Sequence, residues 1–254
     1  MPNEDNKKTE YSEFMLLDQL TIYFQSLAPE EKSILKSKLS SRIPQFFDEK
    51  NQLKSDTDLD VKQFNYLATA LLKISPDHQN IPNNGIAYKG KPSWITDNLL
   101  KELQNEALAR RKQPLDRIDH FLGCGGKHAD LLSVNQEILK FVSNHVRKRV
   151  KPTGIASYLY YDKPGLGIRP HVDSDVFSIN MMLMLKHEYK QNFEPSVTRI
   201  FPANSEMESY QLSIGEVMIM HGGAVIHTRS TIKEFENVHL LTIGFSHEYP
   251  LVEI

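Results

Sequence analysis

Residues 165–175 read GLGIRPHVDSD, and the histidine and the first aspartate in this stretch are spaced two positions apart. In an extended strand, residues two apart point to the same face, so His171 and Asp173 would present an imidazole and a carboxylate side by side. An apolar run, SINMMLML, follows at residues 178–185 and predicts a strand in the protein core. The pair therefore has the chemistry of two metal ligands at the start of a β-rich region.

A third candidate ligand, His227, lies 54 positions after Asp173, between two apolar, strand-like segments. Two histidines and one carboxylate form the facial triad that is typical of non-heme Fe(II) sites. Zinc is the alternative metal, because it accepts the same ligands. His221 lies six positions before His227, in the sequence HGG. The two glycines indicate a turn, so we expect His221 beside the site rather than in it.

The order of these features resembles the Fe(II)/2-oxoglutarate-dependent dioxygenases, in which an early strand of a double-stranded β-helix (jelly-roll) carries His-x-Asp and a late strand carries the distal histidine. The resemblance covers roughly the last 100 residues and includes the lead-in LSIGE at residues 212–216. It implies that His171, Asp173 and His227 bind Fe(II) and form the catalytic centre. It also implies 2-oxoglutarate and O2 as cosubstrates, which would take the coordination positions that the protein leaves free.

The residue that anchors the far carboxylate of 2-oxoglutarate departs from the family pattern. The family usually supplies Arg or Lys roughly ten to twenty positions after the distal histidine, where it can pair with the carboxylate. The polar residues around that window here are Glu236, Asn237, His239 and Thr242, and no arginine occurs there. His239 could donate a hydrogen bond to the cosubstrate, although a neutral imidazole is a weak anchor for a carboxylate.

Three cations elsewhere could replace the missing anchor. Arg229 follows His227 by two positions, and in an extended strand both would face the cavity. Arg169 precedes His171 by two, and the same argument turns it inward. Lys186 ends the strand after the metal motif, where the resemblance to the asparaginyl hydroxylase and related JmjC enzymes places an anchoring lysine. A structural carboxylate could pair with each cation equally well. We rank Arg229 first, with Arg169 as an anchor or as a clamp for a substrate carboxylate.

Tyr158 and Tyr160 share one face of the predicted strand at residues 155–161, just before the metal motif. Related enzymes often place a tyrosine there that hydrogen-bonds the cosubstrate, so both are candidates for the cosubstrate site. A core or surface aromatic pair is the other interpretation. Ser178 and Asn180 are polar positions in an otherwise apolar strand and are candidates for lining the same cavity.

The spacing of apolar residues divides the chain into a helical half and a β-rich half, which predicts an α+β fold. Helical patterns occur at residues 13–27, 29–39, 61–74, 97–111 and 129–150. Glycine and proline predict a loop at 77–92, and the glycines at 123–126 predict a turn. Short β-branched and aromatic runs then predict about eight strands, at 155–161, 167–173, 177–185, 197–201, 208–213, 216–220, 224–229 and 238–246. We expect residues 1–150 to form a mainly helical region packed around a jelly-roll core at 151–254, as one structural unit.

The composition limits the classes of partner. With 254 residues, a single cysteine (Cys124) and a net charge of −2, the chain can bury a large core but has no intramolecular disulfide, no cysteine-based zinc site and no excess of positive charge for a phosphate backbone. Residues 1–8 are polar, and no apolar run approaches the length of a membrane span. These observations predict a cytoplasmic protein that binds a small-molecule substrate rather than nucleic acid or a membrane, and they leave the oligomeric state open.

Three functions fit these residues. The first is hydroxylation of an unactivated C–H bond in a small molecule, such as an amino acid or a natural-product intermediate, with release of succinate and CO2. The carboxylate of Asp173 favours hydroxylation over halogenation, because related halogenases replace it with a small residue. The second is a nucleic-acid base dealkylase, which the HVDSD sequence at residues 171–175 resembles, although the pair of late arginines of that branch is absent. The third is a jelly-roll metal-binding module without catalytic activity.

Overall fold

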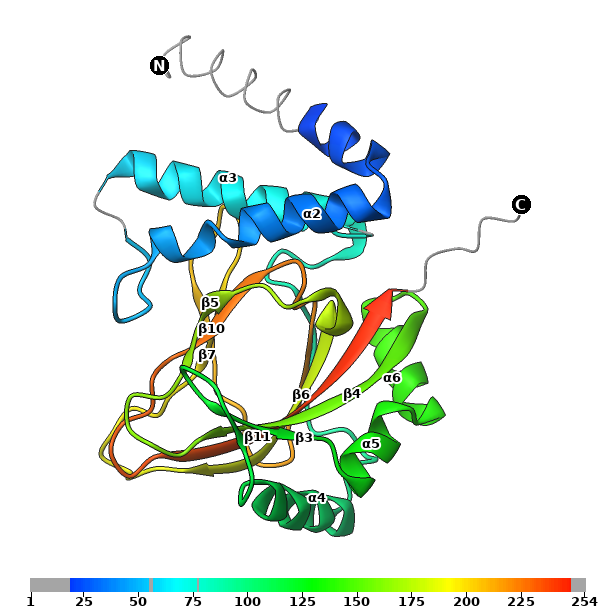
Figure 1. Cartoon of the computed structure of the whole chain (residues 1–254), viewed down its shortest axis with the longest axis vertical. Coiled ribbons are helices and arrows are strands. Elements are labelled where there is room, and N and C mark those ends of the chain that lie inside the picture. The colour runs from blue at the N-terminus through cyan, green and yellow to red at the C-terminus, as the bar shows by residue number, and fades with distance from the viewer. Residues whose placement is uncertain (1–18, 55–56, 77, 248–254) are drawn as a thin grey trace.

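Two antiparallel β-sheets face each other at the centre of the protein, and helices pack around them (Figure 1). The computed structural model describes residues 19–54, 57–76 and 78–247. The chain is therefore a mixed α/β protein, as the two types of apolar pattern predicted.

The larger sheet contains seven strands in the order β1-β9-β6-β11-β4-β3-β2, and every neighbouring pair is antiparallel. Its strands are β1 (Ile86–Gly90), β2 (Leu115–Asp116), β3 (Phe121–Cys124), β4 (Val150–Tyr161), β6 (Ile179–Glu188), β9 (Val217–Met220) and β11 (Asn237–His247). The first seven residues of the central strand β6 are all buried, because helices cover one face of the sheet and the second sheet lies opposite the other. A strand buried on both faces is apolar along its whole length rather than at alternate positions.

The smaller sheet has the strand order β5-β10-β7-β8 and is also antiparallel. Its strands are β5 (Ile168–His171), β7 (Thr198–Phe201), β8 (Glu208–Tyr210) and β10 (Ile226–Arg229). In the pairing of β5 with β10, His171 lies directly opposite His227. This register brings the two histidines together although they are far apart in the sequence.

Three helices cover the outer face of the larger sheet: α4 (Asp97–Arg110), α5 (Lys127–Ser133) and α6 (Gln136–Val146) (Figure 1). Leu103 of α4 and Val142 of α6 are fully buried in one cluster with Leu183 and Ile243 of the sheet. Burying an apolar side chain of this size contributes roughly 1.5–3 kcal/mol. The helix layer therefore packs against the face of the larger sheet that points away from the smaller sheet.

Two further helices lie on the side of the smaller sheet, α2 (Pro29–Ser40) and α3 (Asp58–Ile74), with the short 3-10 turns η1 (Ile43–Phe46) and η2 (His78–Asn80) near them. The 3-10 turn η3 (Asp175–Phe177) packs against β11 and β4 of the larger sheet. Phe64 of α3 lies edge-on to Phe201 of β7, with ring centroids 6.3 Å apart, and both cluster with Ile226 of β10. None of the helices in the described ranges is long and apolar enough to cross a membrane.

Side-chain caps fix where several helices begin. The hydroxyl of Thr57 accepts a hydrogen bond from the third backbone N–H of its helix, α3, and Thr96 caps α4 in the same way. The side chain of Asn135 accepts hydrogen bonds from the backbone N–H groups of residues 137 and 138 and so begins α6. The single long helix predicted for residues 129–150 was therefore wrong, because this cap divides it into α5 and α6.

The strands predicted after residue 151 are all present, with shifted ends. In the first half, the loop predicted at 77–92 contains β1, and the turn predicted at 123–126 overlaps the end of β3, so both predictions were incomplete. The larger sheet thus takes three strands from before residue 150; they are too short, at two to five residues, to show a period. The helix predicted at 13–27 lies partly outside the described residues, and residues 19–26 are helical.

His239 on β11 makes the fold sensitive to acid. Its ring is buried edge-on to Tyr160, and burial together with the charge of Lys186 lowers the pKa of His239 to about 4. A histidine in the unfolded chain has a pKa of about 6.5, so the unfolded state takes up the proton first, and the free energy of unfolding falls as the pH drops from about 6.5 towards 4. We expect His239→Gln to lose less unfolding free energy than the unsubstituted protein between pH 7 and pH 5, measured by urea unfolding. Equal losses would contradict this assignment.

Candidate functional site

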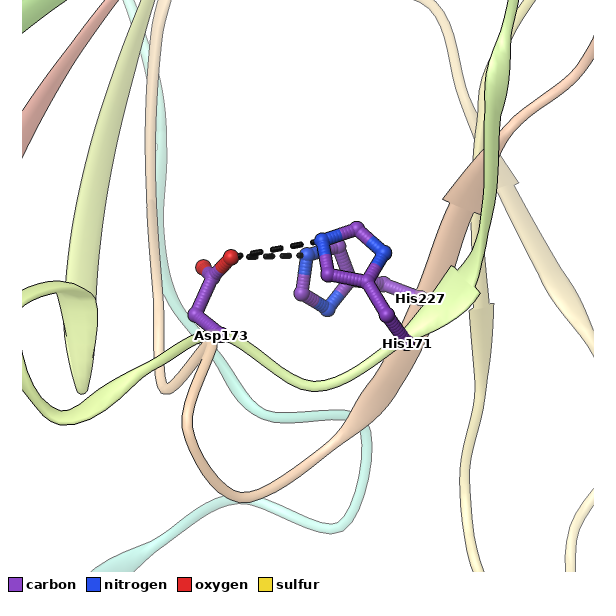
Figure 2. A group of neighbouring side chains, drawn as sticks. All are labelled: His171, Asp173 and His227. Atoms are coloured by element: carbon purple, nitrogen blue, oxygen red, sulfur yellow. Dashed lines mark ion pairs between the residues drawn. The ribbon is translucent and has the colours of Figure 1, made fainter. Parts of the chain in front are cut away.

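His171 at the end of β5, Asp173 in the loop that follows and His227 on β10 come together in the structure. Their potential ligand atoms all lie within 4.8 Å of one another. Figure 2 shows the carboxylate of Asp173 facing both rings, with its Oδ1 3.3 Å from Nε2 of His171 and 3.7 Å from Nε2 of His227. The three groups converge on one point, as the ligands of a metal ion must.

Backbone carbonyls orient both imidazole rings. Nδ1 of His171 lies 2.7 Å from the carbonyl oxygen of Arg169, and Nδ1 of His227 lies 3.0 Å from that of Val225. With the proton on Nδ1, each ring donates to its carbonyl, and Nε2 keeps the lone pair that faces Asp173. Each ring is thus oriented so that Nε2 would bind a metal when the ring is neutral and would donate to Asp173 when the ring is protonated.

The carboxylate of Asp173 is ionised at physiological pH. Burial alone would raise the pKa of Asp173, but the charge of His227 and hydrogen bonds with both histidines hold it far below its usual range. Burial lowers the pKa of His171, yet the hydrogen bond and charge of Asp173 raise it overall. An ionised carboxylate is the form that binds a metal. A bound cation would stabilise the negative charge of Asp173 in place of the protons on the two histidines.

The turn at residues 221–223 and the side chain of Asn180 hold Asp173 in place. The backbone N–H of Asp173 donates to the carbonyl of Gly222 at 2.8 Å, and its Oδ2 accepts a hydrogen bond from Asn180 at 2.9 Å. Gly222 lies so close that a Cβ there would stand 2.1 Å from Oδ2. Asn180 therefore lies at the site, in agreement with its predicted place in the cavity.

His221 lies beside the site, as its two following glycines predicted, and is not one of the converging groups. Its ring stacks on His247 with centroids 6.2 Å apart, and burial lowers the pKa of His221 to about 4. Ser178 was predicted to line the cavity, but its hydroxyl donates to the carbonyl of Phe245. Ser178 and His247 instead line a separate hollow of about 350 Å³ beside α2.

The triad opens into a pocket of about 270 Å³ between the two sheets. The hairpin formed by β2 and β3 closes one side of it, because the backbone carbonyl and the carboxylate of Asp119 accept hydrogen bonds from the N–H groups of Gly167 and Arg169 beside β5. The other lining residues are Arg117, His120, Leu122, Ser157, Leu159, Tyr161, Ile168, Phe177, Met182, Thr198, Thr228, Arg229, Leu240 and Thr242.

Arg229 is a buried cation in this pocket, and it forms no ion pair with any carboxylate in the part of the chain that the structure describes. Its Nη2 donates to the hydroxyl of Ser196 at 2.8 Å and to the Ser196 carbonyl at 3.2 Å. Its Nε–H has no partner among the described residues. Burial lowers the pKa of Arg229, while Tyr161 and Glu236 raise it. Because an arginine in a protein stays protonated, the pocket contains a positive charge with donors to spare.

Arg169 does not face the pocket, so that prediction was wrong. Its side chain is exposed and lines a different surface hollow. The cause is an irregularity in β5: His171 pairs with His227, but Ile168 pairs with Arg229, so three steps on β5 match two on β10. The extra residue breaks the alternation of side chains, and Ile168 lines the pocket in place of Arg169.

Lys186 and His239 also lie outside the pocket and correct two further predictions. Lys186 pairs with Glu188 at 2.9 Å. The register of β6 against β11 shifts by one between Met184, which faces Leu240, and Lys186, which faces His239. Met184 is on the pocket face of the sheet, and this bulge turns Lys186 to the opposite face. His239 also lies on that opposite face, where its ring packs against Tyr160 on the helix side of the sheet.

Tyr158 and Tyr160 point into the helix layer, so neither lines the cavity as predicted. The hydroxyl of Tyr158 donates to Glu106 at 2.6 Å, and that of Tyr160 donates to the carbonyl of Ala107 at 2.7 Å, both on α4. The alternation along β4 was correct, but both faces of this strand are buried, and the pattern alone does not show which face is inside. The tyrosine that lines the pocket is Tyr161, on the opposite face.

Sequence reasoning missed Tyr161 and Ser196. Tyr161 lies on the same face of β4 as Ser157 and Leu159, which also line the pocket. The mixture of polar and apolar residues on this face was the sequence pattern that could have indicated a pocket wall. Ser196 lies in the loop before β7, where no periodic pattern exists, so nothing in the sequence linked it to Arg229.

No protein-family model matches the sequence. No curated protein matches it either. Solved structures with a similar fold include HygX from Streptomyces hygroscopicus with nickel, 2-oxoglutarate and hygromycin B bound, at a TM-score of 0.52 and 10% identity, over 65% of this chain and 84% of that one. They also include the non-heme α-ketoglutarate-dependent epimerase SnoN from nogalamycin biosynthesis, at a TM-score of 0.51 and 10% identity, over 63% of this chain and 84% of that one.

The chain thus has the fold of the Fe(II)/2-oxoglutarate-dependent oxygenases. At this level of identity the similarity concerns the fold alone. What the chain can bind must therefore be argued from its own pocket.

Replacing any of the three converging residues should remove metal binding. We expect His171→Ala, Asp173→Ala and His227→Ala each to weaken Fe(II) affinity by roughly 100-fold or more, because each removes a ligand rather than an outer partner. Anaerobic Fe(II) titration measures this, and circular dichroism checks that the fold is kept. His221→Ala is the control and should retain Fe(II) affinity. Unchanged affinity in His227→Ala would overturn the ligand assignment.

Gly222→Ala tests the support of Asp173 by the turn. The added Cβ would stand 2.1 Å from Oδ2, so the carboxylate must move away from the histidines. We expect Fe(II) affinity to fall by roughly 10- to 100-fold with little change in secondary structure. Gly154→Ala is the matched control: its φ of +69° makes alanine strained, but no described atom lies within 4 Å of the new Cβ. It should lower stability and leave Fe(II) affinity intact.

Proposed function

We propose that the protein is an Fe(II)/2-oxoglutarate-dependent oxygenase that hydroxylates an unactivated C–H bond of a small molecule. One observation carries the proposal: a single pocket contains the triad of His171, Asp173 and His227 together with the buried, unpaired guanidinium of Arg229. Two facing antiparallel sheets are the arrangement expected for the double-stranded β-helix of this superfamily, and they support the proposal.

The ligand set suits Fe(II). Two imidazoles that present Nε2 and one ionised carboxylate would hold Fe(II) from one side, and small ligands could bind it from the other. Asn180 hydrogen-bonds Oδ2 of Asp173, so that Oδ1 is the oxygen turned towards the histidines. Bound Fe(II) and 2-oxoglutarate would supply the oxidising chemistry, with O2 as the oxidant and succinate and CO2 as by-products.

Arg229 suits the far carboxylate of 2-oxoglutarate. A carboxylate buried without a partner is costly, so a dicarboxylate inside this pocket requires a cation. Among the three predicted anchors, Arg229 is the one that lines the pocket, and its donors are not used up by an acidic side chain of the described chain. A guanidinium can bind a carboxylate through two parallel hydrogen bonds. The tyrosine of the site is then Tyr161, whose ring lies 5.5 Å from the Arg229 guanidinium.

The remaining walls support a small-molecule substrate. They combine apolar side chains such as Leu122 and Leu159 with the hydroxyls of Ser157 and Thr242, and the volume of about 270 Å³ lies just below the range of about 300–1,000 Å³ that is usual for small-ligand sites. The similar fold of HygX, solved with hygromycin B bound, supports the same class of substrate. Asp173 occupies the ligand position that a halide would need, which favours hydroxylation over halogenation.

Succinate release by the full chain tests the proposal directly. The protein would be incubated with Fe(II), ascorbate, 2-oxoglutarate and a panel of amino acids, natural products, peptides and alkylated bases. We expect succinate formation that depends on Fe(II) and is stimulated by small molecules of the first two groups. Stimulation by alkylated bases alone would make the protein a base dealkylase. Fe(II) binding without succinate from any mixture would make it a metal-binding module.

Arg229→Ala should raise the KM for 2-oxoglutarate by roughly 10²-fold or more. The reason is the loss of a charge-assisted pair worth about 3 kcal/mol. Fe(II) affinity should change little, because Arg229 is not among the converging ligands. Arg229→Met, which refills the volume without the charge, should show the same defect and rules out a simple cavity effect.

Arg169→Ala and Lys186→Ala are the controls for Arg229. Both remove a cation from outside the pocket, so the KM for 2-oxoglutarate should stay within about twofold of the unsubstituted value, a change below 0.5 kcal/mol. If either control raises the KM and Arg229→Ala does not, the anchor has been assigned to the wrong strand.

A further inference from the structure

We propose that Ser196 is a positioning residue for the cosubstrate anchor: held by Glu236, it fixes the guanidinium of Arg229 in the pocket while keeping its charge free for a carboxylate. This inference rests on the proposed function, and it adds a role for a loop that the metal site does not use. The three residues come from three segments: the loop before β7, the end of β10 and the loop before β11.

Ser196 contacts Arg229 through two acceptors. Its hydroxyl oxygen and its backbone carbonyl both accept hydrogen bonds from Nη2 of Arg229, at 2.8 and 3.2 Å. Both residues are buried, at 3% exposure each, so water does not compete for these bonds. The two contacts use one nitrogen of the guanidinium and leave Nε–H unpartnered among the described residues.

Glu236 holds Ser196 from the opposite side. Its Oε1 accepts a hydrogen bond from the backbone N–H of Ser196 at 2.7 Å and from the hydroxyl at 2.5 Å. An ionised carboxylate only accepts hydrogen bonds, so the single hydroxyl proton must point to Glu236. The lone pairs of the hydroxyl then point to Arg229, which fixes the direction of the chain of hydrogen bonds from Arg229 through Ser196 to Glu236.

Glu236 is itself fixed. Nε2 of His187 on β6 lies 2.9 Å from Oε1, and the backbone N–H of Lys233 donates to Oε2 at 3.2 Å. Burial would raise the pKa of Glu236, but hydrogen bonds from His187 and Ser196 lower it to about 2. The carboxylate is therefore charged and immobile at neutral pH, and Ser196 has a permanent acceptor.

The interposed serine decides what the arginine can do. A direct ion pair between Glu236 and Arg229 would occupy the guanidinium and cancel its charge within hydrogen-bonding distance. With Ser196 between them, Arg229 is oriented without being neutralised, and its side chain does not have to be ordered when a ligand binds. Preorganisation of this kind raises affinity by removing the cost of ordering.

The test measures binding of 2-oxoglutarate to the Fe(II)-loaded full chain without O2, by titration calorimetry. Ser196→Ala removes the hydroxyl and keeps every charge, and we expect its Kd for 2-oxoglutarate to rise roughly tenfold or more, as for a lost hydrogen bond to a charged group. Ser196→Thr keeps the hydroxyl and should restore most of the affinity. In turnover, Ser196→Ala should raise the KM for 2-oxoglutarate and leave kcat near its original value.

Ser230→Ala is the matched control. Among the described residues, the Ser230 hydroxyl forms hydrogen bonds with the backbone of Val197 and none with the guanidinium of Arg229. Its Kd for 2-oxoglutarate should equal that of the unsubstituted protein. An unchanged Kd in Ser196→Ala, or an equal loss of Fe(II) and 2-oxoglutarate affinity, would overturn the role of Ser196 alone. Failure of the unsubstituted protein to bind 2-oxoglutarate would overturn the proposed function and this inference with it.

Discussion

The antiparallel pairing of β5 with β10 is the constraint on which the site depends. It sets His171 opposite His227, and β10 is fixed on its other side by four aligned residue pairs with β7. A slip of one residue would turn His227 and Arg229 to the outer face together, because side chains alternate along a strand. The packing of α3 against β7 and β10 therefore protects the site at a distance, by keeping the strands in register.

One pocket contains two opposite charges that are kept apart and stabilised in different ways. Asp173 is ionised because two imidazoles flank it, and Arg229 forms no ion pair with a carboxylate of the described residues, because Ser196 lies between it and Glu236. The first arrangement could bind a cation between its three groups, and the second could bind an anion. A metal ion chelated by a dicarboxylate would place its positive charge at the triad and a negative carboxylate at Arg229. The geometry of the pocket and its charges therefore favour the same two ligands.

The sequence predicted the β-rich core because strand alternation is a local property, and the order of the motifs, which resembles a known family, predicted the meeting of His171, Asp173 and His227. Asp173 itself lies in the loop after β5 rather than in the strand. Sequence reasoning ranked Arg229 first among the cations, and Arg229 lines the pocket, but it also turned Arg169 and Lys186 inward and chose the wrong tyrosines. Bulges in β5 and β6 reversed the alternation for Arg169 and Lys186, and a bulge is set by the partner strand rather than by the residues themselves. β4 is buried on both faces, so Tyr158 and Tyr161 looked equally interior. Ser196 joins the site through tertiary contacts that no pattern encodes.

The three converging residues come from separate segments, so a metal ion bound between them would link the stability of the folded state to the supply of that metal. An ion held by His171, Asp173 and His227 would be a removable cross-link that closes more than fifty residues of chain into a loop. An ion that binds the native state and not the unfolded chain stabilises the native state by mass action, by about 2.7 kcal/mol at a free concentration 100 times its Kd. In a protein of ordinary marginal stability, such a gain would be large enough for a shortage of the metal to lower the amount of folded protein while most folded molecules still hold the ion.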